Sequence, residues 1–415
     1  MRNRAYWLGA AAFVLAFFHR VAPGAIAADL RETFHASATT LGFIAAFYFY
    51  PYAAMQLPSG VLADSAGPRR LFTAGSVVAG IGSLLFASAT DVSWLLAGRA
   101  LVGFGVAVAF VSVLKLIASW FSEREFATWV GVLQLIGNLG GMLGAWPLAW
   151  LVERVSWRVV FAVTGLISLV LAACIWLWVR DSPRDAGLEP ADAPAARPSG
   201  DDVHWLAGLR VVARNPQTWL TFVALFGMIG TYLTFNGLWA VPYLTDAFGM
   251  DRETATLHVT VAILGFALAA PAMGALSDRI GRRLPPLQVM SVIYLACWAP
   301  WVAGWQMPLW ASVGVFALMG IGISGAVTSW ALAKEQNPPA LAGTATSLVN
   351  GGGFLGVALL QPAVGWLVDL SAGSPVLDAY RQAAGLLAAI TLAGVIATFL
   401  LRETYCRQVQ QPIRR

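Results

Sequence analysis

Two stretches of the sequence, far apart along the chain, share one pattern. The first is Gly60–Arg70, with the sequence GVLADSAGPRR, and the second is Gly274–Arg283, with the sequence GALSDRIGRR. Both follow the pattern Gly-x-Leu-x-Asp-x-x-Gly and end in paired arginines. The pattern occurs at equivalent points of the two halves of the chain, which predicts a parallel internal repeat.

The amino-acid composition of the whole chain is typical of a membrane protein. Of the 415 residues, 58% are hydrophobic and only 11% are charged, whereas a water-soluble domain carries roughly 25% charged residues. The apolar residues form about twelve blocks of roughly 20 residues, the length that crosses a bilayer. The three cysteines are widely separated, so neither a disulfide framework nor a metal site is expected.

The blocks predict an all-α integral membrane protein with twelve transmembrane helices in two pseudo-symmetric bundles. We expect an N-terminal six-helix bundle at 1–179, a polar linker at 180–214, a C-terminal six-helix bundle at 215–402 and a tail at 403–415. The expected helices are 5–28, 39–63, 69–90, 93–119, 125–150, 156–179, 217–243, 254–277, 285–304, 308–333, 340–367 and 380–402.

The distribution of basic residues predicts the orientation. With the N-terminus inside, most Lys and Arg residues fall in cytoplasmic segments, so both termini and the linker are expected to be cytoplasmic. The net charge of +5 is therefore attributed to basic residues that set the orientation in the membrane, and no nucleic-acid partner is expected. The first apolar block resembles a signal peptide, but His19 and Arg20 interrupt it, which favours a retained helix.

The chain resembles the major facilitator superfamily, because the paired loop pattern is that superfamily's most specific signature. The run Arg99–Gly105 (RALVGFG) and a glycine-rich fifth helix match it as well, and the fifth helix carries Gly131, Gly137, Gly140, Gly141 and Gly144. The resemblance implies a monomeric carrier in a bacterial inner membrane. It also implies a rocker-switch cycle around a central cavity lined by helices 1, 4, 7 and 10.

The loop residues form a candidate gating motif. Gly67 and Gly281 permit the backbone angles of a tight turn, and Asp64 and Asp278 can accept hydrogen bonds from N–H groups at a neighbouring helix terminus. The alternative is that the arginines only set topology. The full gating set is Gly60, Asp64, Gly67, Arg69, Arg70, Arg99, Gly274, Asp278, Gly281 and Arg282.

Basic side chains at membrane depth are functional candidates, because burying them is costly. Arg20 lies near the middle of the first helix, and Pro23 deprives the carbonyl of His19 of its helical donor. A guanidinium binds a carboxylate or phosphate through two parallel hydrogen bonds, so Arg20 and His19 are predicted to bind an anionic solute. Lys115 either contacts this solute or extends to the lipid headgroups.

Acidic side chains are confined to loops and helix ends. A buried carboxylate for proton transfer is therefore not expected, and proton coupling would fall on His19 or on the solute. Exchange against a counter-anion and facilitated transport stay open.

Uncharged polar and aromatic residues at helical spacing predict the rest of the cavity, with inter-helix hydrogen bonding as the alternative. These residues are Tyr48, Tyr52, Gln134, Asn138, Tyr232, Asn236, Trp330 and Asn350.

The excess of basic groups favours a small organic anion, namely a carboxylate, an amino acid or a short peptide. The run Phe17–Arg20 resembles bacterial organic-anion and sugar-phosphate permeases, but the second arginine of the phosphate exchangers is missing from helix 7. Gly137–Gly141 and Asn350–Gly353 resemble the signatures of nitrate and nitrite porters, whose arginines on helices 2 and 8 are also missing. An enzyme is not expected, since no nucleophile, metal cluster or cofactor site is found; a non-transporting receptor is a further alternative.

Overall fold

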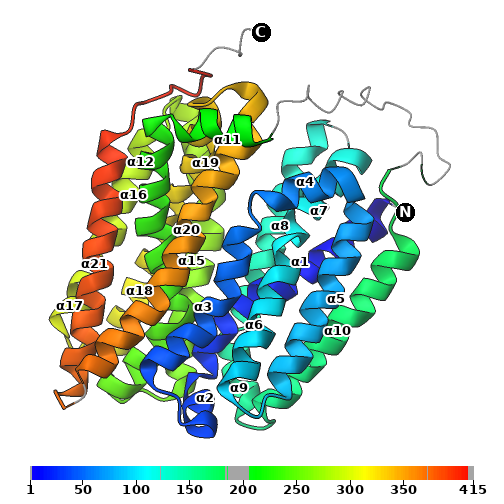
Figure 1. Ribbon diagram of the computed structural model, residues 1–415. Coiled ribbons are helices and arrows are strands. Elements are labelled where there is room, and N and C mark those ends of the chain that lie inside the picture. The colour runs from blue at the N-terminus through cyan, green and yellow to red at the C-terminus, as the bar shows by residue number, and fades with distance from the viewer. Residues whose placement is uncertain (1, 122, 183–184, 186–204, 372, 410–415) are drawn as a thin grey trace. The chain divides into compact units, whose positions relative to one another are not determined.

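The computed structural model describes residues 2–121, 123–182, 185, 205–371 and 373–409. Every regular element in these residues is helical. The chain divides into two compact units, shown in Figure 1 from blue to red along the sequence. The first unit comprises Met1–His35 and Phe43–Ser199, and the second comprises Ala36–Gly42 and Gly200–Arg415.

The first half of the chain is built from helices that run back and forth beside one another (Figure 1). They are α1 (Arg2–Ala25), α2 (Ala27–Phe34), α3 (Ala38–Ala54), α4 (Pro58–Ala66), α5 (Pro68–Ala87), α6 (Val92–Ala107), α7 (Ala109–Trp120), α8 (Glu123–Leu143), α9 (Trp146–Val152) and α10 (Trp157–Trp178).

The second half repeats this arrangement after α11 (Trp205–Ala213). Its further α-helices are α12 (Pro216–Leu225), α13 (Thr231–Thr234), α14 (Ala240–Pro242), α15 (Arg252–Ile280), α16 (Leu284–Ala296), α17 (Ala299–Ala303), α18 (Leu309–Ile323), α19 (Val327–Glu335), α20 (Ala342–Leu370) and α21 (Val376–Leu400). The π-helical segments are Phe226–Gly230, Phe235–Trp239 and Tyr243–Ala247, and the 3₁₀ turns are Ser324–Ala326 and Pro339–Leu341.

Eleven helices in the described residues are long and apolar enough to cross a membrane, and each lies at a predicted span. The remaining prediction, 39–63, is divided into α3 and α4 by a turn at residues 55–57. Pro51 lies inside α3 and Pro58 begins α4. Because proline cannot donate the helical N–H bond, the second span is helical on both sides of an interruption.

The glycines of the predicted fifth helix allow α8 to lie directly against α1. A Cβ atom on Gly140 would lie 2.1 Å from the carbonyl oxygen of Val14, and one on Gly144 would lie 2.8 Å from that of Phe18. Gly137 faces the ring of Phe13 in the same way. Small residues permit such close packing of membrane helices, so Gly137, Gly140 and Gly144 allow α8 to pack against α1.

Substituting Gly140 with alanine is expected to destabilise the protein by about 1–3 kcal/mol, because the added methyl forces α8 away from α1. Gly131→Ala is the matched control, since it changes the same helix at a position with nothing within 4 Å. Thermal unfolding in detergent would compare the two variants. Equal melting temperatures would show that the α1–α8 contact does not require glycine.

Candidate functional site

Arg20 on α1 is buried and its guanidinium is bound by two tyrosine hydroxyls. Its Nε donates to Tyr48 Oη at 3.3 Å and its Nη2 donates to Tyr52 Oη at 2.7 Å. The guanidinium also lies over the rings of Phe17 and Tyr52, at 4.4 and 4.8 Å from their centroids. Tyr48 in turn donates to the carbonyl of Ala16 at 3.1 Å. The structure thus brings together three of the residues that the sequence assigns to solute binding.

Arg99 on α6 is bound by backbone carbonyls. Its guanidinium donates to the carbonyls of His19 at 2.8 Å, Ile44 at 3.1 Å and Ala45 at 3.4 Å, and its side chain is 1% exposed. The His19 carbonyl is the one that Pro23 leaves without a helical donor. Arg99 therefore completes the hydrogen bonding of a proline-interrupted helix and fixes α1 and α3 to α6.

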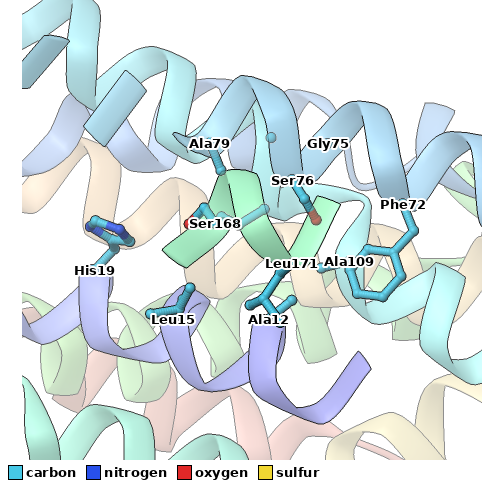
Figure 2. A pocket seen from close by; sticks show the side chains of 12 residues that line it. Ala12, Leu15, His19, Phe72, Gly75, Ser76, Ala79, Ala109, Ser168 and Leu171 are labelled. Carbon is cyan, nitrogen blue, oxygen red and sulfur yellow. The ribbon is translucent and has the colours of Figure 1, made fainter. Parts of the chain in front are cut away.

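The ring of His19 occupies a different place from Arg20. It lines a small pocket inside the first unit, together with residues of α5, α6 and α10 (Figure 2). Both ring nitrogens are buried without a hydrogen-bond partner. A role for His19 in solute or proton binding stays a prediction.

The other candidates of the first unit lie on α7 and α8. Lys115 is half-buried on α7. Asn138 is buried and donates to the backbone carbonyl of Gln134 at 2.9 Å, while the Gln134 side-chain oxygen is buried without a partner. This bond runs back to the preceding turn of α8 itself, so it is not the inter-helix hydrogen bond that the alternative predicts.

The seventh predicted span, which is the first of the second unit, carries Tyr232 and Asn236 within an irregular helix. Tyr232 lies between two π-helical segments, and Asn236 lies inside the second of them. The hydroxyl of Tyr232 and the side-chain oxygen of Asn236 are buried without a partner. π-Helical turns are rare and occur frequently at functional sites, which makes this span the strongest candidate region of the second unit.

Trp330 and Asn350 are paired across α19 and α20. The indole N–H of Trp330 donates to the side-chain oxygen of Asn350 at 3.2 Å. Farther along α20, Gln361 is fully buried and both polar atoms of its amide have no partner. These residues join their helices and also place polar groups at depth.

The first loop motif is organised by an acid from the end of α10. Gly67 has a left-handed φ of 81°, and a Cβ atom there would lie 2.8 Å from a carboxylate oxygen of Asp181. The same carboxylate accepts the backbone N–H of Arg69 at 2.6 Å, in the first turn of α5. Arg70 is exposed, and the surroundings of Gly60 and of the Asp64 side chain are outside what the structure describes.

The second loop motif forms a partly exposed ion-pair network around Arg283. Gly281 takes a left-handed φ of 66° at the end of α15, whereas a Cβ atom on Gly274 would meet no atom of another element within 4 Å. Arg283 bonds Asp278 at 2.6 Å and Glu335 at 2.8 Å. Burial alone would lower the pKa of Arg283, but its hydrogen bonds to Glu335 and Asp278 outweigh this effect and raise it.

The sequence predicts that Asp278 accepts hydrogen bonds from N–H groups at a helix terminus. In the structure, Glu403 accepts the N–H groups at the start of α16 instead. The Glu403 carboxylate accepts the N–H groups of Arg283 at 2.9 Å and Leu284 at 3.0 Å, at the start of α16. Asp278 has the guanidinium of Arg283 as its partner. Arg282, the predicted gating arginine, has a side chain 53% exposed and lies 3.8 Å from Glu403.

The two halves therefore share a helix cap that sequence reasoning missed. Asp181 follows the sixth span and Glu403 follows the twelfth, and each accepts the N–H of the second residue after the motif glycine. The sequence feature that could have indicated this shared cap is the similarity of Arg180–Ser182 (RDS) to Arg402–Thr404 (RET). An acid at an N-terminal turn satisfies exposed N–H groups and complements the helix dipole.

The segment Leu401–Val409 continues this network beyond α21. Thr404 donates to Glu335, the backbone N–H of Val409 donates to the Glu335 carbonyl at 2.9 Å, and Gln336 donates to the carbonyl of Arg402 at 3.0 Å. These described residues of the predicted tail are thus fixed to the ends of α15 and α19.

Glu403→Gln is expected to destabilise the second unit by about 1 kcal/mol, because the neutral amide is a weaker cap. Burial would raise the pKa of Glu403, but four backbone N–H groups outweigh this effect and lower it from its ordinary 4.5. The stabilisation is therefore complete above pH 4.5 and is lost as pH falls through the lower, folded-state value.

Melting temperatures of the wild type and Glu403→Gln between pH 7 and pH 3.5 test this expectation, and their difference should shrink at the acidic end. Asp378→Asn is the control, because its pair with Arg381 is exposed and worth little. A difference independent of pH would contradict the charged cap.

No cluster of three or more His, Cys, Asp or Glu that could hold a metal occurs in the described parts of the chain. The three cysteines are free thiols.

Comparisons with known proteins match nearly the whole chain. A family model described as Major Facilitator Superfamily matches residues 8–239 and 233–413. The D-galactonate transporter of Escherichia coli O6:H1 is 26% identical over 399 residues, covering 91% of each chain. The membrane sensor protein UhpC of Salmonella typhimurium is 26% identical over 95% of this chain and 89% of its own. The solved structure of a D-xylose-proton symporter shares the fold, with a TM-score of 0.75, 14% identity and coverage of 98% and 99%.

Proposed function

Since this chain belongs to the Major Facilitator Superfamily, we propose that it transports a small organic anion whose carboxylate binds Arg20. The observation that carries this proposal is a guanidinium, 8% exposed within a membrane span, held by Tyr48 and Tyr52. A planar guanidinium donates two parallel hydrogen bonds to a carboxylate.

Sugar acids are the class of carboxylate that we favour over amino acids and short peptides. A relative over 91% of the chain is a D-galactonate transporter, and a sugar acid combines one carboxylate with several hydroxyls.

The transport cycle is proposed to follow alternating access, with the six-helix bundles 1–179 and 215–402 moving as units. The protein would work as a monomer in a bacterial inner membrane, with both termini cytoplasmic. Its coupling would use protons or a counter-anion.

Uptake of radiolabelled D-galactonate into proteoliposomes tests this function. We expect uptake that saturates, competition from other sugar acids, and no competition from neutral hexoses of the same size. Equal competition by neutral and anionic sugars would overturn the assignment to anions. Repeating the measurement with and without an inward proton gradient distinguishes proton coupling from exchange or uniport.

A non-transporting sensor is the second candidate, and similarity to a protein named as a membrane sensor favours it. A sensor would bind the sugar acid, as measured by calorimetry on purified protein, but would give no uptake. Binding together with uptake would exclude this reading, whereas binding alone would support it.

A further inference from the structure

The pocket beside His19 lies wholly within the first unit and is lined mainly by apolar side chains. About 20 Å³ of it is open to the centre of a water-sized molecule. A cavity needs roughly 10–15 Å³ by this measure to hold one water. Leu15, Phe72, Ala109 and Leu171 form much of its wall, while three polar side chains, those of His19, Ser76 and Ser168, line it as well (Figure 2).

The imidazole nitrogens of His19 are buried polar atoms at this pocket that have no hydrogen-bond partner. The residue is 1% exposed, and neither ring nitrogen has a partner. A neutral imidazole carries one N–H donor and one acceptor nitrogen, and leaving either unsatisfied in a buried site costs about 1–3 kcal/mol.

His258 in the second unit shows how a buried histidine is satisfied by protein alone. It is 0% exposed, its Nδ1 lies 2.7 Å from the Thr254 carbonyl oxygen, and its Nε2 lies 2.9 Å from the Ser312 hydroxyl. The ring of His19 also has aromatic neighbours, with the ring centroids of Phe18 and Phe161 at 5.6 and 5.7 Å, but it has no such hydrogen-bond partners.

The two serines of the pocket offer the complementary groups. Ser168 donates its hydroxyl proton to the Thr164 carbonyl at 2.9 Å, so its oxygen can act as an acceptor toward the pocket. Ser76, on α5, contributes a second hydroxyl. A buried water typically makes about three hydrogen bonds, and one imidazole nitrogen with two hydroxyls would provide them.

We propose that this pocket binds a single water molecule between the His19 ring and the hydroxyls of Ser76 and Ser168. The water connects α1 to α5 and α10 at the level of the residue before Arg20. The His19 carbonyl is bonded to Arg99, so His19 is held through both its backbone and its side chain. Its ring is then a fixed structural contact of α1, separate from the Arg20–Tyr48–Tyr52 cluster.

Solid-state NMR of ¹⁵N-histidine-labelled protein in proteoliposomes tests the proposal through magnetisation transfer from water to the imidazole nitrogens. The chain has four histidines, and His19→Phe assigns the signal of His19 by its loss. His35 is exposed and is the positive control, whereas His258 is equally buried but bonded to protein and is the negative control. We expect transfer to His19 at least severalfold faster than to His258. Transfer as slow as that to His258 would overturn the proposal.

Two pocket variants locate the water. Ser76→Val replaces a hydroxyl with two methyl groups in the same space and is expected to reduce transfer at His19 to the level of His258. Ser168→Ala removes one partner without filling the pocket and is expected to slow the transfer at least twofold. Transfer at His19 that is unchanged in both folded variants would show that the water lies elsewhere.

Discussion

Replacing Arg20 with lysine is expected to raise the KM for the transported carboxylate by about 10- to 100-fold. Lysine keeps the positive charge but cannot donate two parallel hydrogen bonds from one plane, and each hydrogen bond to a charged group is worth about 1.5–3 kcal/mol. Arg20→Gln removes the charge as well and should abolish measurable uptake. The measurement is initial uptake into proteoliposomes over a range of solute concentrations.

Arg154→Lys provides the matched control, because it makes the same chemical change at an exposed arginine that stacks on Trp150. Its uptake should equal that of the wild type. Tyr52→Phe should give an intermediate loss, since it removes a hydroxyl that positions the guanidinium. Normal transport by Arg20→Lys would rule out bidentate recognition of the solute by Arg20.

Replacing Arg99 with methionine is expected to have the largest effect on stability. The substitution keeps an unbranched side chain but leaves the carbonyl of His19 without a donor and removes the bonds of Arg99 to the carbonyls of Ile44 and Ala45. A buried acceptor without a partner costs about 1–3 kcal/mol, and the loss of the other two bonds adds to this cost. We expect a large fall in melting temperature and a low yield of folded protein after detergent extraction.

Arg158→Met tests whether burial decides this effect. Arg158 also donates to two carbonyls, those of Ala87 and Ala89, but it is half-buried, so water can replace its bonds. Its melting temperature should change far less. Similar losses in both variants would show that the cost does not come from stranded buried carbonyls.

The hydrogen bond between Arg99 and the His19 carbonyl shows which parts of the site could be predicted from the sequence and which could not. Pro23 identifies the carbonyl that lacks a donor, and the superfamily resemblance identifies Arg99, but the sequence does not place one beside the other. The spans were predictable for a simpler reason: their length follows from the thickness of the bilayer. The break between α3 and α4 escaped prediction because hydropathy does not report where a helix is interrupted.

The sequence mainly failed to predict ion-pair and hydrogen-bond partners that are distant from each other along the chain. Asp181, Glu335 and Glu403 lie at or just beyond helix ends, where an acidic side chain usually faces water, so the residues around each of them do not identify its partner. Likewise, the spacing of His19 and Arg20 says that their side chains diverge but does not say which of them faces the interior of the bundle. Side-chain direction depends on packing against helices that a local pattern does not include.

The cap on α16 also has a consequence for the order in which the molecule is completed during synthesis. Arg283 and Glu403 are 120 positions apart, which at ribosomal rates of 5–20 residues per second corresponds to roughly 6–24 s. Until Glu403 is made, the opening turn of α16 has no carboxylate to bind. The equivalent contact of the first half, between Arg69 and Asp181, involves only residues translated before α11. The nascent first half can therefore mature early, whereas the second half must wait until Glu403 has been translated.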